Sequence, residues 1–225
     1  EHHIKKLRSV NKSIDIKECV FDYIKLGSPT FNDLLNKIKN TVIINTKEDF
    51  KESVIYKGFK YDYGTGGIHG CIKEGVYCSD DYYDIIDADV TSWYPKHLGK
   101  GFVDAYKDIL DQRTKAKRAK EMSISDALKL SANGAYGKSA SEHSFLFDTK
   151  FTMSITVNGQ LLLTMLAERL VDNIPDITVL QINTDGITVK LPKIYLNLYD
   201  QICNNWEADT KLNLEYVSYS KMIIR

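Results

Sequence analysis

A short motif near the C-terminal end constrains the fold more than any other part of the chain. Residues 179–191, VLQINTDGITVKL, place two runs of β-forming residues on either side of Asn183-Thr184-Asp185-Gly186. Asp-Gly between alternating apolar residues is the strongest short-range signal for a β-hairpin, because Gly accepts the positive φ of such a turn. We therefore expect two antiparallel strands with Asp185 at their tip. Asp185 is then a turn residue or a carboxylate held there for a chemical purpose.

The periodicity of the remaining chain predicts an α+β fold. Residues 81–90 alternate as a strand, whereas residues 101–120, 123–138 and 152–170 have the spacing of helices, the second with a Ser cap. After the hairpin, a helix over 192–210 and a β run over 212–225 are expected. This order favours an antiparallel sheet with helices on one face. Further expected elements are a helix in residues 28–40, a short strand in 40–45, and a glycine-rich connector in 61–70 that marks a domain boundary.

Composition excludes several classes of protein. Thirty basic and thirty acidic residues cancel, so no global charge indicates a nucleic-acid partner. The four cysteines show no CxxC spacing and no paired histidine, which argues against zinc and suits a reduced cytosolic protein. The most apolar run contains Asn158, Gln160, Glu168 and Arg169, so it predicts a buried helix and no contact with a membrane.

Charge is distributed unevenly along the chain. Residues 79–89 carry five aspartates and no base, and residues 112–120 carry five bases and no acid. These runs are two solvated faces, or they are an acidic metal site beside a basic phosphate-binding element. Asp89 ends a strand, and Asp185 would be the natural second ligand if the two strands are neighbours. Mg²⁺ asks for only one or two protein carboxylates, and two aspartates can hold the two ions of an in-line phosphoryl transfer.

A phosphate site is suggested by the helices between the two aspartates. Arg113 and Lys117 are four residues apart and share a helix face. Lys129, Asn133 and Tyr136 form one helical stripe, which suits a nucleotide better than a core, because the cation meets phosphate and the ring supports a base or sugar. The alternative is an ordinary solvated helix.

These elements, in this order, resemble the polymerase core of family B DNA polymerases, and phage members in particular. DVTSWYP is similar to the first motif of that family, D-x-x-S-L-Y-P. KLSANGAYG is similar to K-x-x-x-N-S-x-Y-G, with Gly134 in place of Ser, and QINTDG is similar to Y-x-D-T-D-S. The pair Arg113 and Lys117 matches the R-x-x-x-K of the fingers helix. Lys221 matches the K-x-Y element, with Ile223 in place of Tyr, and YGTGGIHG loosely resembles the Y-x-G-G linker.

The resemblance covers residues 61–225 and implies a role for each matched position. It implies a polymerase palm in residues 61–97 and 139–225, with a helical fingers insertion in 98–138. It assigns no role to residues 1–60, which are either an N-terminal segment of another kind or what is left of an exonuclease or other N-terminal domain. The implied roles are two Mg²⁺ ions, or Mn²⁺ in their place, on Asp89, Asp185 and the Val90 carbonyl; nucleotide binding by Arg113, Lys117, Lys129, Asn133, Tyr136 and Tyr94; and contacts of Lys221, Gly66 and Gly67 with DNA.

The resemblance also implies a function and its partners. The expected activity is DNA-directed synthesis of DNA from deoxynucleoside triphosphates on a primer-template, for replication of a phage genome in the host cytoplasm. Other phage replication proteins are expected partners. An RNA-synthesising palm polymerase and a catalytically silent palm that binds nucleic acid or scaffolds a replication complex are the alternatives.

Three departures from the family pattern bear on these expectations. Asn183 replaces the first Asp of the third motif, and we expect activity to be retained because the second Asp is the indispensable ligand. YPKHLG follows Ser92 almost at once, so either a helix is lost or a segment between Ser92 and Trp93 is missing. Tyr94 is the steric gate for the sugar only in the first case. No D-x-E exonuclease motif occurs in residues 1–60, and the chain stops before a thumb, which predicts the core of a larger polymerase.

Overall fold

The computed structural model describes residues 9, 11–44, 50–91, 103–144 and 146–225. Its internal contacts divide the chain into two compact units. The sheet unit comprises Asp15–Thr91 and Thr156–Arg225, and the helical unit comprises the described parts of Glu1–Ile14 and Ser92–Ile155. Among the helices in these described residues, none has the length and apolar character needed to cross a membrane.

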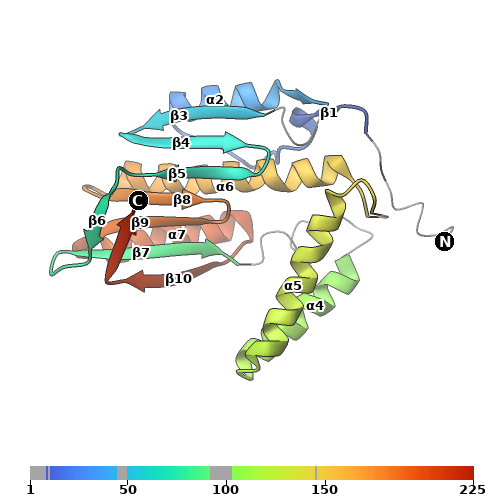
Figure 1. The fold of residues 1–225 in the computed structure, drawn as a ribbon. Helices are drawn as coiled ribbons and strands as arrows, with labels where there is room; N and C mark the ends of the chain where they lie inside the picture. Colours follow the sequence, from blue (N-terminus) through green and yellow to red (C-terminus); the bar gives the residue numbers. More distant parts are fainter. Residues whose placement is uncertain (1–8, 10, 45–49, 92–102, 145) are drawn as a thin grey trace. The chain divides into compact units, whose positions relative to one another are not determined.

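The sheet unit is built on seven antiparallel strands in the order β10-β7-β9-β8-β5-β4-β3 (Figure 1). Strand β11 crosses the open face of this sheet and pairs with β6, and β1 pairs with β2. The expected α+β class with an antiparallel sheet is therefore confirmed. The strands are β1 (Ile14–Asp15), β2 (Val42–Ile43), β3 (Lys51–Tyr56), β4 (Phe59–Gly64), β5 (Gly67–Cys71), β6 (Gly75–Cys78), β7 (Tyr83–Val90), β8 (Thr178–Asn183), β9 (Gly186–Pro192), β10 (Leu214–Tyr219) and β11 (Lys221–Ile224).

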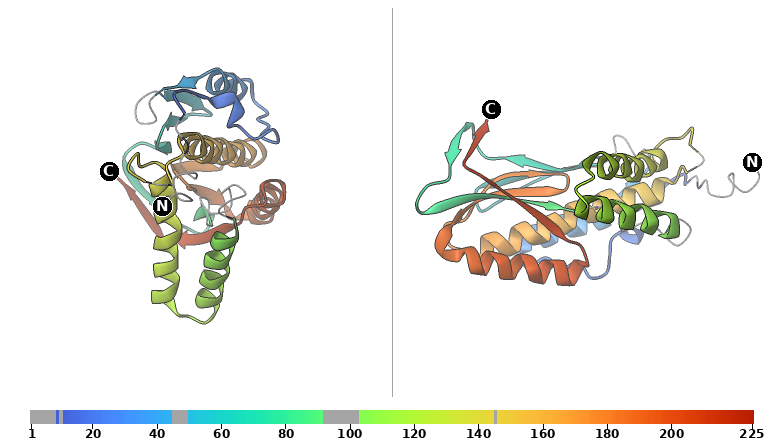
Figure 2. Two further views of the ribbon diagram at one scale, coloured as in Figure 1. Left: turned by 90° about the vertical axis from the view of Figure 1, so that its right-hand side faces the viewer. Right: turned by 90° about the horizontal axis from the view of Figure 1, so that it is seen from below.

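Helices cover one face of this sheet and leave the other face open. They are α2 (Pro29–Lys39), the Thr156–Asn173 part of α6 (Thr149–Asn173), and α7 (Leu196–Thr210), which lie on the side opposite β11 (Figure 2). Short 3-10 turns, Ile16–Glu18 and Lys193–Tyr195, complete the unit. The covered face is apolar: Ala88, Ile187 and Val189 have no exposed surface. Burial of such side chains is the main favourable term in folding, so this face fixes which side of each strand remains open.

Polar residues of α6 connect it to three other segments. The Asn158 amide accepts from the Phe21 N–H at 2.8 Å, and the Gln160 amide bonds both the N–H and the C=O of Gly64. The Glu168 carboxylate, buried, accepts from the N–H groups of Gly27 and Ser28 at 2.7 Å each. The polar residues that interrupt the apolar run are therefore the hydrogen-bonding points of a buried helix, because buried polar groups need partners.

One expected element differs from what the structure shows, and another is confirmed. The glycine-rich run in residues 61–70 is not a connector, because its residues form most of the hairpin β4–β5 inside the large sheet. Gly70 approaches the Lys60 carbonyl so closely that no side chain fits there. Expected helix α2 is confirmed, with Ser28 as its side-chain cap and Pro29 in its first turn.

The helical unit contains α4 (Val103–Arg118) and α5 (Met122–Ser139), which pack against each other. Both were expected from sequence. The Ser cap expected for α5 was wrong, because Glu121 occupies the cap position and makes no side-chain capping bond. The proposed division into palm and fingers stays a prediction.

Glu168→Ala should lower the free energy of unfolding by about 3 kcal/mol, because two buried N–H groups lose a charged acceptor. Urea unfolding measures this change. Glu74→Ala, an exposed position, is the control and should stay within about 0.5 kcal/mol of the unsubstituted chain. Equal values for the two variants would contradict the assigned role of Glu168.

The four free thiols should differ in reactivity. Cys71 and Cys78 are exposed, whereas Cys19 and Cys203 are buried, and burial raises the pKa of the Cys203 thiol to about 11. Only the thiolate reacts with a disulfide reagent, so we expect Cys71 and Cys78 to react in the folded protein at pH 8 and all four to react in urea. Rapid labelling of Cys203 without denaturant would contradict the packing of α7.

Candidate functional site

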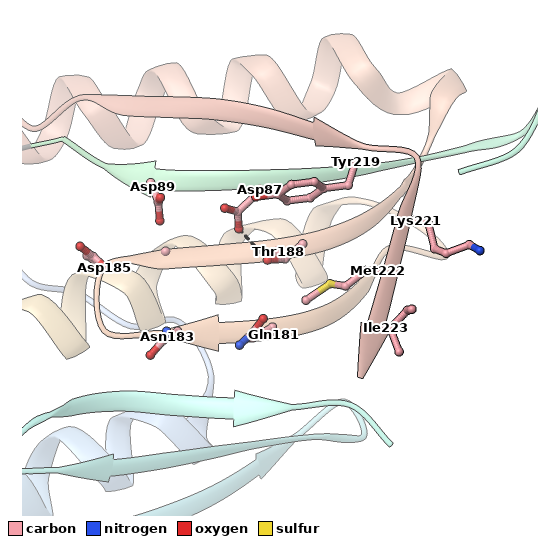
Figure 3. Close-up of a pocket in the computed structure, with 11 residues that line it drawn as sticks. Asp87, Asp89, Gln181, Asn183, Asp185, Thr188, Tyr219, Lys221, Met222 and Ile223 are labelled. Carbon is pink, nitrogen blue, oxygen red and sulfur yellow. Dashed lines mark hydrogen bonds between the residues drawn. The ribbon is translucent and has the colours of Figure 1, made fainter. Parts of the chain in front are cut away.

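A hollow of about 480 Å³ lies on the open face of the sheet, between the sheet and β11 (Figure 3). Strands β7, β8 and β9 form its floor, and β11 with the end of β10 forms its wall. Its lining is dominated by acidic and polar side chains. The lining residues are Asp87, Asp89, Gln181, Asn183, Asp185, Gly186, Thr188, Tyr219, Lys221, Met222 and Ile223.

Strand β7 supplies two carboxylates to this hollow. Side chains alternate along a strand, so Asp87 and Asp89 share the open face while Ala88 and Val90 are buried under the helices. Asp89 is exposed, and Asp87 is half-buried and accepts a 2.6 Å hydrogen bond from the Thr188 hydroxyl on β9. The same alternation that builds the core therefore directs both carboxylates into the hollow.

The expected hairpin is confirmed as strands β8 and β9, but its turn differs from the expectation. Asn183 and Gly186 are cross-strand partners, so Thr184 and Asp185 form the turn and Gly186 is the first residue of β9. The positive φ belongs to Thr184, at 34°, and Gly186 is not among the residues with positive φ. The reason given for the glycine, a turn conformation, was therefore wrong.

Two neighbouring strands hold the turn in place. The Thr184 N–H donates to the Ile68 carbonyl on β5 at 2.9 Å, and the Val90 N–H on β7 donates to the Asp185 carbonyl at 2.7 Å. Gly67, with φ 142°, lies against Thr184, and a methyl group there would come within 3.2 Å of the Thr184 side chain. The backbone of Asp185 is thus fixed from both sides.

The structure brings Asp89 and Asp185 to the same end of the hollow. The condition that their strands are neighbours is met, because β7 pairs with β9 and Asp89 lies directly opposite Gly186, the residue after Asp185. Asn183 is on the same open face, exposed, on the other side of Gly186. Within the described residues, no group of three or more His, Cys, Asp or Glu side chains is arranged to hold a metal ion.

The expected DNA-binding residues occupy two different places. Lys221, on β11, lines the hollow away from Asp185 and is exposed, with Cys78 as its strand partner. Gly66 and Gly67 lie where β4 turns into β5; Gly66 is exposed with open space around it, and Gly67 is buried. Gly67 therefore has a structural role in supporting the turn at Thr184.

The expected nucleotide-binding residues belong to the helical unit. Arg113 and Lys117 lie on α4 and are half-buried, and Lys129 on α5 is exposed. The helical backbone of α5 places Lys129, Asn133 and Tyr136 on one face, as the spacing predicted. Gly134 and Gly137 have open space where a side chain would be. Tyr94 lies outside the described residues.

Besides Asn183, three polar side chains on the floor of this hollow were not assigned to the site by sequence reasoning. Asp87 precedes Asp89 by two positions, Gln181 precedes Asn183 by two, and Thr188 follows Gly186 by two. The period of two in a strand was the available signal, because each pair must share a face. Once one residue of each strand is known to face the hollow, this period identifies the other polar residues of the floor.

Neither a protein family model nor a curated protein sequence matches this chain. The function is therefore inferred from the residues and from their arrangement.

Gly67→Ala should lower the free energy of unfolding by about 1–3 kcal/mol, since φ of 142° is strained for any other residue and the methyl group meets Thr184. Gly66→Ala is a matched control one residue away, and it should change stability by less than about 0.5 kcal/mol because the site is exposed and open. Urea unfolding compares the two. A larger loss for Gly66→Ala would show that Gly67 does not support the turn.

Proposed function

We propose that this chain is the palm and part of the fingers of a DNA-directed DNA polymerase, which adds deoxynucleotides to a primer 3′ end during replication of a phage genome. One observation carries the proposal. Asp89 and Asp185, far apart in the sequence, lie at the same end of an open polar hollow on a sheet whose other face is covered by helices. The motifs that contain them are those that resemble the first and third motifs of family B polymerases.

The residues at this end of the hollow suit a hard divalent cation, Mg²⁺ or Mn²⁺. Carboxylate oxygens are the ligands such ions prefer, and Mg²⁺ keeps several positions for water and substrate phosphate. A hollow of about 480 Å³ leaves room for these further ligands. Two carboxylates that do not surround the ion are compatible with a site in which the substrate supplies the remaining ligands. The Val90 carbonyl is a proposed additional ligand.

The proposed reaction is nucleotidyl transfer. The primer 3′ oxygen forms a bond to the α-phosphorus of the incoming triphosphate, the bond from that phosphorus to the oxygen bridging to the β-phosphate breaks, and pyrophosphate leaves. The proton of the 3′ hydroxyl passes to water. The cation, when bound, favours ionisation of that hydroxyl and neutralises charge on the phosphates.

The protein contributes mainly position and charge to this reaction. The backbone that carries Asp89 and Asp185 is hydrogen-bonded to neighbouring strands, so the attachment points of the two carboxylates are held in place. We propose that Arg113, Lys117 and Lys129 bind the triphosphate and that Asn133 and Tyr136 contact the nucleotide. Lys221 would contact a phosphate of the primer-template, since lysine serves as a point charge for phosphate.

A catalytically silent palm that binds nucleic acid is the second candidate. Asn183 favours it, because an amide stands where the resemblance expects a carboxylate. Primer extension separates the two candidates.

Asp89→Asn and Asp185→Asn should each reduce primer extension by the complete protein with Mg²⁺ by roughly 10²–10³-fold, because charge stabilisation at the phosphate is lost. Asp81→Asn is the matched control: it removes a carboxylate from the same acidic run, outside the hollow, and should leave the rate unchanged. Asn183→Asp should change the rate by less than about tenfold, consistent with less than 1.4 kcal/mol of barrier height.

Three results would count against this proposal in different ways. Equal extension by the unsubstituted protein, Asp89→Asn and Asp185→Asn would remove the metal-site assignment. No incorporation of either deoxynucleotides or ribonucleotides by the unsubstituted protein would favour the silent palm. Preferential incorporation of ribonucleotides would indicate an RNA-synthesising palm.

A further inference from the structure

We infer that Gly186 is a positioning residue for Asp89: because it carries no side chain, it leaves the space in which the Asp89 carboxylate lies beside the turn. This inference rests on the proposed function, and it concerns a residue to which that function assigns no role. It also explains why a glycine occupies position 186, since the structure contradicts the turn conformation expected from the sequence.

The strand register places these two residues in the closest kind of contact. The Val90 N–H donates to the Asp185 carbonyl, which is one of the two bonds of a hydrogen-bonded pair, and the paired register begins at the next position, with Asp89 and Gly186. Pairs alternate along an antiparallel ladder, so the next pair, Asp89 and Gly186, is of the non-hydrogen-bonded type. In such pairs the Cα atoms are only about 4.5 Å apart and the side chains lie nearest to each other.

The Asp89 carboxylate occupies the position that a side chain at 186 would fill. A Cβ atom built on Gly186 would overlap Asp89 Oδ1 and would lie 3.2 Å from Asp89 Cγ. The backbone of Gly186 has no positive φ, so any residue could adopt its conformation. The carboxylate opposite is therefore what the glycine accommodates.

A side chain at 186 should move the carboxylate and leave the fold intact. Strand β7 is hydrogen-bonded to β9 on one side and to β10 on the other, so its backbone does not shift easily. The Asp89 side chain is exposed and can rotate about its own two torsions. The overlap is thus relieved by turning Asp89 away from the turn, which separates its carboxylate from Asp185.

The test compares Gly186→Ala with Gly64→Ala. Gly64 is a strand residue with no positive φ, and a Cβ there has only an ordinary contact, 3.7 Å from the Phe50 carbonyl oxygen. Thermal unfolding reports the fold, titration with Mn²⁺ followed by electron paramagnetic resonance reports cation binding without turnover, and primer extension reports activity. Asp89→Asn serves as the reference for loss of the site.

We expect the unfolding temperature of both glycine variants to equal that of the unsubstituted protein or to lie slightly above it, because glycine weakens a strand. Gly186→Ala should bind Mn²⁺ about 10- to 100-fold more weakly, the range found when residues that orient metal ligands are changed, and should extend primers correspondingly slowly. Gly64→Ala should match the unsubstituted protein in Mn²⁺ affinity and in the rate of primer extension.

The outcomes separate this inference from the proposed function. If Asp89→Asn loses Mn²⁺ binding and Gly186→Ala keeps it, the inference is wrong and the proposed site stands. If Gly186→Ala unfolds at a markedly lower temperature, the glycine serves the fold and the inference is likewise wrong. If the unsubstituted protein binds no Mn²⁺, both the proposed function and the inference fail.

Discussion

The pairing of β7 with β9 is the constraint on which the site depends. Side chains on a strand alternate between the two faces, so a slip of one residue would turn Asp87 and Asp89 toward the helices. The apolar residues prevent that slip: Ala88 opposes Ile187, and Ile86 opposes Val189, and all four are buried on the covered face. The free energy that fixes the acidic face therefore comes from the apolar face behind it.

Helix α6 extends this constraint to the turn that carries Asp185. Its Gln160 amide bonds both backbone groups of Gly64, and Gly64 pairs with Gly67 across the β4–β5 turn. Gly67 in turn packs on Thr184, whose N–H is held by β5. A chain of direct contacts thus leads from the buried helix to the turn. Gln160 thus holds β4 in place on α6, and the apolar residues of the helix supply the burial.

Features that depend on neighbouring residues could be predicted from the sequence, and features that depend on distant partners could not. The helix at α2, the strand at β7 and the hairpin around Asp185 follow from local periodicity and turn chemistry. The role of Gly186 could not be predicted, because it depends on Asp89, which reaches it only through strand pairing. The β4–β5 hairpin was missed for a related reason: its glycines look like a linker until the partners at Lys60 and Thr184 are known.

The side chains around Gly186 offer a physical reason why position 183 carries an amide and not a carboxylate. Gly186 has Asp89 opposite it on β7 and Asn183 opposite it on β8, all on the open face. An aspartate at 183 would place a second carboxylate beside the same gap, and like charges at short range disfavour each other's ionised form. An amide is nearly isosteric and avoids that repulsion. Asp87, two pairs further along β7, keeps an additional carboxylate in the hollow, with the Thr188 hydroxyl as its donor. Under the proposed function, the negative charge is therefore concentrated on β7 and the turn, which is consistent with a site that tolerates an amide at 183 and requires carboxylates at 89 and 185.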